Sequence, residues 1–186
     1  MNQQVLPKFT KREDPMEQTG PTRRLAAFIS QTSYDQLPIE VRDKSKELIL
    51  DQLGVALASS TLPWNRKVLE YVQDMGINGD SRVIGTRYRT SIEYAALIKG
   101  TFGHGFELDD YCTPCGAHVG CIVLPAALAV AEKQGASGLD FLTAFALGAE
   151  MVLRVGLPLP SEALPLAGSI QPAFTDHSAR SPRLQN

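Results

Sequence analysis

IVLPAALAVAEKQGASGLDFLTAFALGAEMVLRVG, residues 122–156, is the stretch with the clearest structural pattern. Its first half is a run of small and apolar residues that ends at Gly135, and Ser137 then precedes a second apolar segment. Glycine is typical just after the last turn of a helix, and serine is typical just before the first turn. The stretch therefore predicts two consecutive helices joined by a short turn.

Four more helices are predicted upstream of this pair, because apolar residues recur there at helical spacing. These helices are expected in residues 22–33, 38–60 and 64–75 and from residue 91 onward. Thr22 is a candidate N-cap of the first, and Pro38 fits the first turn of the second. The segment SRVIG, residues 81–85, is either one brief strand or an extended link. The predicted fold class is all-α.

Two segments are apolar on more than one side of their helices, namely residues 48–58 and 122–131. Such helices need partners on several sides. We therefore expect both to be buried against each other or against neighbouring helices. If the chain is on its own, helices built for the middle of a larger helical domain are expected to leave apolar surface exposed.

The pattern divides the 186 residues into three parts. Residues 1–21 are polar and lack apolar periodicity, which predicts a flexible leader, and residues 22–156 form the helical domain. Residues 157–186 are rich in proline and predict a disordered tail.

Composition excludes several classes of partner. The chain is 44% hydrophobic and 20% charged, and its formal net charge is −2. Such a charge provides no basic field for nucleic acid or an anionic membrane, and no apolar run is long enough to span a bilayer. The first residues do not resemble a secretory signal, and their acidic residues argue against a mitochondrial leader, so we expect a cytoplasmic protein.

Candidate reactive side chains are concentrated in one loop, between the predicted helices on either side of residue 110. The cluster contains His104, Glu107, Asp109, Asp110 and His118. Grouped carboxylates and imidazoles can act as general acids and bases near neutral pH. A purely structural interpretation is also open, in which the acids solvate the loop and His118 caps a helix.

A metal site is a further alternative for the same loop. Cys112, Cys115, His118 and Cys121 recur every three residues, and thiolate and imidazole are ligands for zinc or an iron–sulfur cluster. The even spacing matches neither paired zinc modules nor a ferredoxin run. Small thiols also fill space in the way that alanine or serine does.

With these motifs in view, KGTFGHGFELDD and the following GAHVGCIVLPAALAVAEKQGASGLDFLTAFALGAEMVLRVG resemble the MmgE/PrpD family. In that family a glycine and a histidine lead into an acidic motif, a loop histidine, a proline-containing helix, "G-x-S-G-x-D" and "G-x-E-x-x-x-R". The matching positions are Gly100, His104, Glu107, Asp109, Asp110, His118, Pro125, Gly135, Ser137, Gly138, Asp140, Gly148, Glu150 and Arg154. The similarity covers about residues 22 to 156, under half of a family member.

The resemblance implies the N-terminal part of a large helical domain and a lyase that needs no metal or organic cofactor. Family members dehydrate 2-methylcitrate or longer alkylcitrates, or decarboxylate cis-aconitate, and a homodimer is implied. His118 matches the loop histidine that faces the substrate, and Glu107 or Asp109 matches the acidic motif that orients the site. A citrate-like polycarboxylate is therefore the expected partner, with an alkylcitrate of a specialised biosynthetic pathway as one hypothesis.

The sequence departs from the family pattern in two ways. Lys99 stands where the family has asparagine, and the family's later lysine, histidine and tyrosine have no counterpart within these 186 residues. Three hypotheses stay open: a dehydratase-like or decarboxylase-like enzyme, a non-catalytic helical interaction module, and a metal-dependent hydro-lyase.

Overall fold

A computed structural model describes residues 20–157. The helices are α1 (Pro21–Gln31), a 3₁₀ helix (Tyr34–Gln36), α2 (Ile39–Ser59), α3 (Pro63–Asp74), α4 (Ile92–Gly103), α5 (Val119–Gln134) and α6 (Gly138–Gly156). The all-α prediction is confirmed. The predicted leader and tail fall almost wholly outside the described residues.

Within the described range, none of the helices combines the length and the apolar character that crossing a membrane requires. The two strands are also very short. β1 (Ser81–Arg82) pairs antiparallel with β2 (Arg89–Thr90), so the brief strand expected in residues 81–85 exists and has a partner that the sequence did not indicate.

Helix α1 belongs to a unit of its own that ends at Thr32. It begins at Pro21 with Gly20 as its N-cap, so the prediction of Thr22 as the cap was wrong. Proline is favoured in the first helical position because the N–H that it lacks would have no helical partner there. Pro38, by contrast, is the N-cap of α2 rather than part of its first turn.

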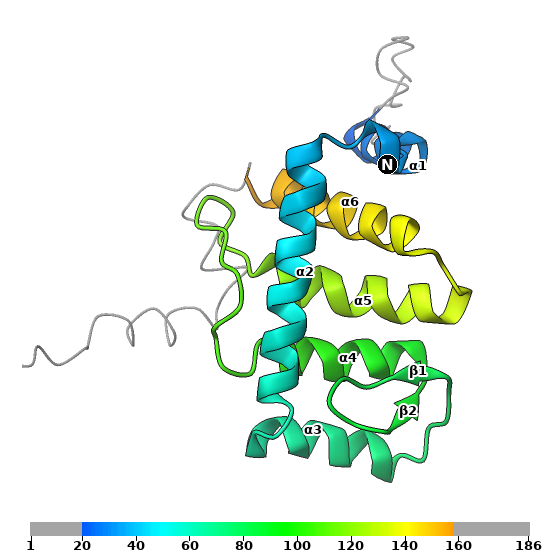
Figure 1. Ribbon diagram of the computed structural model, residues 1–186, viewed down its shortest axis with the longest axis vertical. Coiled ribbons are helices and arrows are strands. Elements are labelled where there is room, and N and C mark those ends of the chain that lie inside the picture. The colour runs from blue at the N-terminus through cyan, green and yellow to red at the C-terminus, as the bar shows by residue number, and fades with distance from the viewer. Residues whose placement is uncertain (1–19, 158–186) are drawn as a thin grey trace, which may run out of the picture. The chain divides into compact units, whose positions relative to one another are not determined.

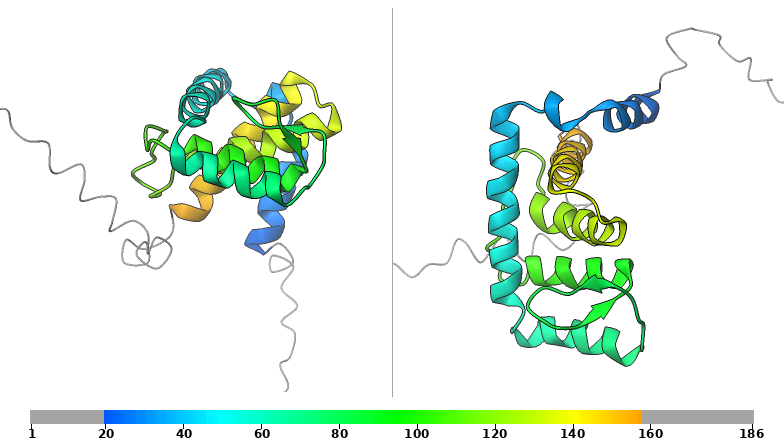
Figure 2. Two further views of the ribbon diagram at one scale, coloured as in Figure 1. Left: turned by 90° about the horizontal axis from the view of Figure 1, so that it is seen from below. Right: turned by 45° about the vertical axis from the view of Figure 1, so that its right-hand side comes forward.

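In the second unit, α2 is the element that the other helices share. Helices α3, α4, α5 and α6 follow one another side by side along it, and α2 contacts α4, α5 and α6 (Figures 1 and 2). Short helices that are consecutive in the sequence are thus also neighbours in space. The loop between α4 and α5 emerges beside α2.

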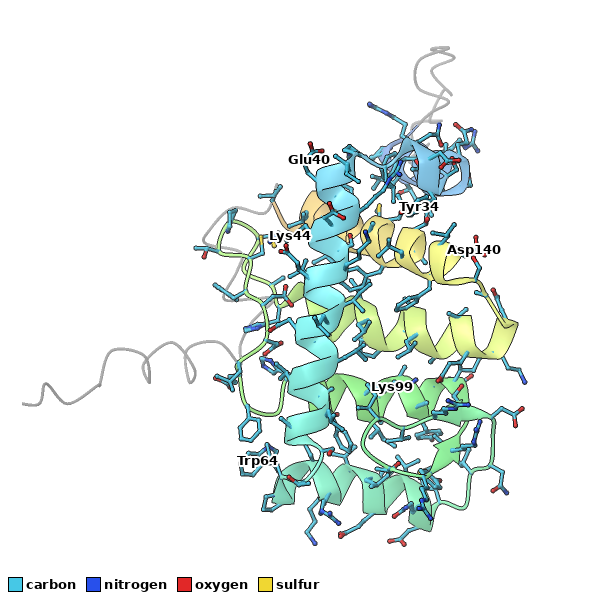
Figure 3. All side chains as sticks on the ribbon, in the orientation of Figure 1. Tyr34, Glu40, Lys44, Trp64, Lys99 and Asp140 are labelled. Carbon is cyan, nitrogen blue, oxygen red and sulfur yellow. The ribbon has the colours of Figure 1, made fainter. Side chains whose placement is uncertain are left out.

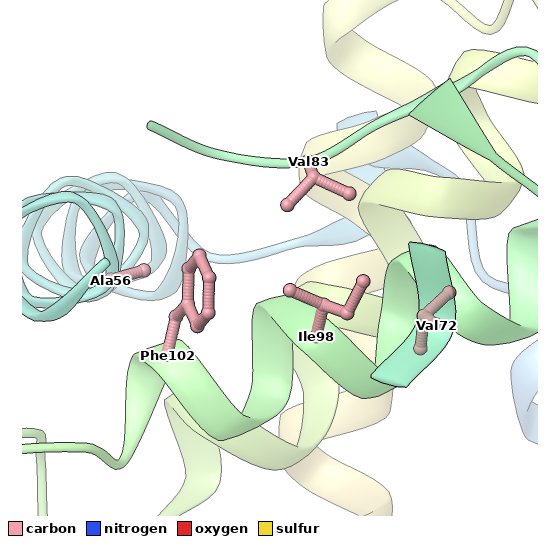
Figure 4. Close-up of a cluster of buried hydrophobic side chains, with 5 residues drawn as sticks. All are labelled: Ala56, Val72, Val83, Ile98 and Phe102. Carbon is pink, nitrogen blue, oxygen red and sulfur yellow. The ribbon is translucent and has the colours of Figure 1, made fainter. Parts of the chain in front are cut away.

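Two apolar clusters hold this arrangement together. Figure 4 shows the first, in which Phe102 and Ile98 of α4 meet Ala56 of α2, Val72 of α3 and Val83, which directly follows β1. In the second, Leu48, Ile49 and Leu53 of α2 pack against buried residues of α5 and α6, Val119, Val123, Leu124 and Phe145. The expected contact of residues 48–58 with 122–131 is therefore present.

Both segments nevertheless keep exposed apolar side chains, in line with the apolar surface expected from the sequence. Leu50 is 72% exposed and Leu57 is 56% exposed, and in α5 Ile122 is 53% exposed. Within the described residues α5 packs between α4 and α6 and against α2, yet part of the surface of both helices has no partner. Helices that are apolar nearly all round consequently keep an apolar face in contact with solvent.

The turn between α5 and α6 matches the sequence prediction closely. Gly135 ends α5 in the left-handed conformation, with φ of 61°. Ser137 accepts a hydrogen bond from the Asp140 backbone N–H, and the Asp140 carboxylate accepts from the Ser137 N–H, which makes a capping box. Hydrogen bonds between residues that are close in the sequence therefore define where α5 ends and α6 begins.

A buried ion pair joins α4 to α5. The Lys99 side chain is 1% exposed, and its Nζ lies 3.0 Å from Glu132 Oε2. Figure 3 shows Lys99 where these two helices face each other. Glu132 Oε2 also accepts a hydrogen bond of 3.1 Å from the Arg82 N–H, so the same carboxylate holds β1.

Candidate functional site

The loop of residues 104–118 brings its two ends together. His104 follows α4 directly and His118 precedes α5 directly. The Cys112 N–H donates to the Ala117 carbonyl at 2.9 Å, and Gly116 N–H donates to Cys112 at 2.8 Å, which closes a tight turn. As a result the two imidazoles lie edge to face, with ring centroids 4.5 Å apart.

Asp109 lies between the two imidazoles. Its side chain has no exposed surface, and its carboxylate oxygens lie 3.0 and 3.2 Å from His104 Nδ1 in hydrogen-bond geometry. His118 Nδ1 lies 3.3 Å from Asp109 Oδ2, within ion-pair distance. Its angle is not that of a hydrogen bond, and this buried nitrogen has no hydrogen-bond partner in the described part of the chain.

The hydrogen bond from His104 to Asp109 can select the tautomer of that imidazole. A carboxylate that accepts from Nδ1–H leaves Nε2 as the free basic nitrogen of a neutral imidazole. His104 is 41% exposed at its side chain and His118 is 27% exposed, so both rings can be reached from solvent. The buried Asp109 carboxylate therefore hydrogen-bonds one accessible imidazole, His104, and lies within ion-pair distance of the other, His118.

Asp110 has a structural partner instead. Its Oδ1 accepts a 2.7 Å hydrogen bond from the Gly120 N–H in the first turn of α5. Although His118 holds the N-cap position, its side chain makes no capping bond. Burial raises the pKa of the Asp110 carboxyl above its usual value, and the hydrogen bond from Gly120 offsets part of this rise.

The Asp110→Ala variant is expected to lose stability, because the Gly120 N–H would lose its acceptor. The loss should be about 1 kcal/mol, as for other helix caps. Urea unfolding followed by circular dichroism measures it. Asp110→Asn keeps an oxygen that can accept this bond and should lose less; equal losses in the two variants would contradict the capping role.

Glu107 is exposed at the surface. It adopts a left-handed conformation with φ of 53°, which non-glycine residues seldom adopt. Together with His104 it lines an open groove of about 630 Å³, whose other residues are Trp64, Asn65, Thr101, Gly105 and Phe106. The groove gives the His104 side of the cluster a space for a small molecule.

Helices α2, α4 and α5 approach one another closely beside the cluster of His104, Asp109 and His118. An added methyl group at Gly103 or Gly120 would overlap the side-chain amide of Gln52. Gln52 lies on α2 and is 1% exposed, and neither its oxygen nor its nitrogen has a hydrogen-bond partner among the described residues. The sequence indicated dense glycines but not the buried amide that they surround.

Cys112, Cys115, His118 and Cys121 do not together form a group that could hold a metal ion. Within residues 20–157, His104, Asp109 and Cys121 are the ligand-type side chains that converge, with ligand atoms within 4.8 Å of one another. The thiol of Cys115 instead donates to the Cys112 carbonyl. The alternative of a site built from all four evenly spaced residues is therefore not supported, because only Cys121 of the four belongs to the converging group.

The fold and the cluster together define a class: an all-helical domain with a histidine–carboxylate cluster in the loop between two of its helices. Comparison with known families gives the particular group. A profile of the MmgE/PrpD N-terminal domain matches residues 23–177. The chain belongs to the MmgE/PrpD family.

Curated relatives carry related names. The chain is 33% identical over 142 residues to the cis-aconitate decarboxylase-like protein oryM of Aspergillus oryzae, covering 73% of this chain and 30% of that protein. It is 32% identical over 148 residues to cis-aconitate decarboxylase of Aspergillus terreus, covering 77% and 30%. For the Mus musculus cis-aconitate decarboxylase the identity is 32%, covering 72% and 28%. The chain thus spans less than a third of the length of these relatives.

Proposed function

We propose that this chain supplies the histidine and carboxylate part of a lyase site that acts on a citrate-like polycarboxylate. The first candidate reaction is dehydration of 2-methylcitrate or a longer alkylcitrate. The observation that carries the proposal is the buried Asp109 carboxylate between two accessible imidazoles beside a groove. Family membership supports the reaction class.

The chemistry needs both a base and an acid. In dehydration, a base removes a proton from the carbon next to a carboxylate, and an acid protonates the hydroxide that leaves from the neighbouring carbon. His118 and His104 are the candidates for these roles, because both rings are accessible and both lie against the Asp109 carboxylate. Glu107, at the groove, is the candidate that orients the substrate or its counter-cation.

Decarboxylation of cis-aconitate is the second candidate, favoured by the names of the curated relatives. There carbon dioxide leaves, its bonding electrons stay on carbon, and an acid delivers a proton to that carbon. The same imidazole pair can supply this proton. A homodimer and a cytoplasmic location remain predictions that follow from the family resemblance and the sequence.

Proton NMR tests the proposal on the whole 186-residue chain. The chain is incubated separately with 2-methylcitrate and with cis-aconitate. We expect the ring resonances of His104 and His118 to shift and an unsaturated acid to form from 2-methylcitrate; consumption of cis-aconitate alone would select the second candidate. Cys112→Ser, in the same loop but outside the cluster, is the control. If neither acid is consumed and neither histidine responds, the proposal is wrong.

A further inference from the structure

We infer that His104, Asp109 and Cys121 form a binding site for a thiophilic divalent cation such as Zn²⁺. The inference does not rest on the lyase proposal, which needs no metal. The three residues come from three places: the end of α4, the loop, and the first turn of α5. Their ligand atoms lie within 4.8 Å of one another.

The ligand types select the kind of cation. Zinc is bound by imidazole nitrogen, thiolate sulfur and carboxylate oxygen at about 2.0 to 2.3 Å, so ligand atoms around it lie roughly 3.3 to 3.7 Å apart. A contraction of about an ångström, within reach of the half-exposed His104, would close the present group onto an ion. Mg²⁺ and Ca²⁺ prefer oxygen ligands throughout and fit this group poorly.

The charges balance as well. Burial, followed by the neighbouring carboxylates of Asp109 and Asp110, raises the pKa of the Cys121 thiol, so a cation has to displace the thiol proton when it binds. A carboxylate and a thiolate together bring two negative charges to the ion, which a divalent cation neutralises. Binding releases the thiol proton to solvent, and the bond from this thiol to the His118 carbonyl is lost.

His118 is the nearest candidate for the fourth position. Its Nδ1, which has no hydrogen-bond partner within residues 20–157, lies 3.3 Å from Asp109 Oδ2, and its ring packs against His104. The cation would therefore occupy the side chains that the proposed lyase reaction uses. It would act as an inhibitor of that reaction.

Co²⁺ is the probe for this site, because a thiolate bound to Co²⁺ gives a charge-transfer band in the near ultraviolet. Titration of the 186-residue chain should give a band that saturates at one ion per chain, with release of about one proton. Zn²⁺ should remove the band by competition and Mg²⁺ should not. None of these readouts requires turnover, so failure of this inference is distinct from failure of the lyase proposal.

Two variants test the ligands Cys121 and His104, and a third is the control. Cys121→Ser should lose the band, and His104→Gln should weaken Co²⁺ binding by at least about tenfold. Cys112→Ser, a matched thiol in the same loop, should bind as the unaltered chain does. Far-ultraviolet circular dichroism checks the fold of each variant, and the exposed His104 gives a second test if Cys121→Ser does not fold. No saturable band, a band that survives in Cys121→Ser, or one that disappears in Cys112→Ser would overturn the inference.

Discussion

Replacing His118 with alanine should lower the turnover number for the accepted polycarboxylate by about 10²- to 10⁴-fold, the usual contribution of a general acid or base. The ring lies on a loop, in contact with His104 and Tyr111 rather than within either apolar cluster. Its loss should therefore remove proton transfer and leave the helices intact. Steady-state rates measured by NMR, with circular dichroism for the fold, give both quantities.

Two comparisons sharpen this prediction. Asp109→Asn removes the charge that His104 and His118 share, and should also lower the turnover number while KM changes less. Cys112→Ser alters the same loop outside the cluster and should keep the turnover number. Unchanged turnover in folded His118→Ala would exclude proton transfer by this imidazole.

Local signals in the sequence were enough to predict most of the helices. Gly135, Ser137 and Asp140 show why: a left-handed cap and a capping box need only residues that are neighbours along the chain. Two-residue strands such as β2 carry no period, so nothing in the sequence marked Arg89–Thr90 as a partner. Exposure of Leu50 and Leu57 depends on which elements lie against α2, and periodicity does not report this.

The candidate site was predicted as a set of residues but not as a geometry. His104, Asp109 and His118 were grouped because they share a loop, and the structure brings these three together. Asp110 was grouped with them for the same reason, yet it caps α5. The approach of Cys121 to Asp109 depends on how the loop folds back between α4 and α5, which no local pattern specifies.

The packing of α4 against α5 explains why a lysine is accommodated at position 99. The family's asparagine is replaced by Lys99, whose buried ammonium pairs with Glu132 across α4 and α5. The side-chain exposures are 1% for Lys99 and 26% for Glu132, so the two charges differ in their access to water. Removal of one partner should therefore have unequal effects.

The Glu132→Gln variant is expected to lose about 3–5 kcal/mol of unfolding free energy, because it leaves a buried ammonium without a counter-charge. Glutamine keeps an oxygen for the Arg82 N–H, so the change isolates the charge. Lys99→Met should lose less, since Glu132 can still be hydrated. The measurement is urea unfolding of each purified chain.

The double variant Lys99→Met/Glu132→Gln separates charge pairing from packing. Replacing a buried ion pair with apolar or neutral groups of similar size is often close to neutral, so this variant should recover most of the stability lost in Glu132→Gln. The two residues are in contact, and the double-mutant cycle should therefore be strongly non-additive. If Glu132→Gln were as stable as the unaltered chain, or if the two losses simply added, the ion pair would not be what holds α4 against α5.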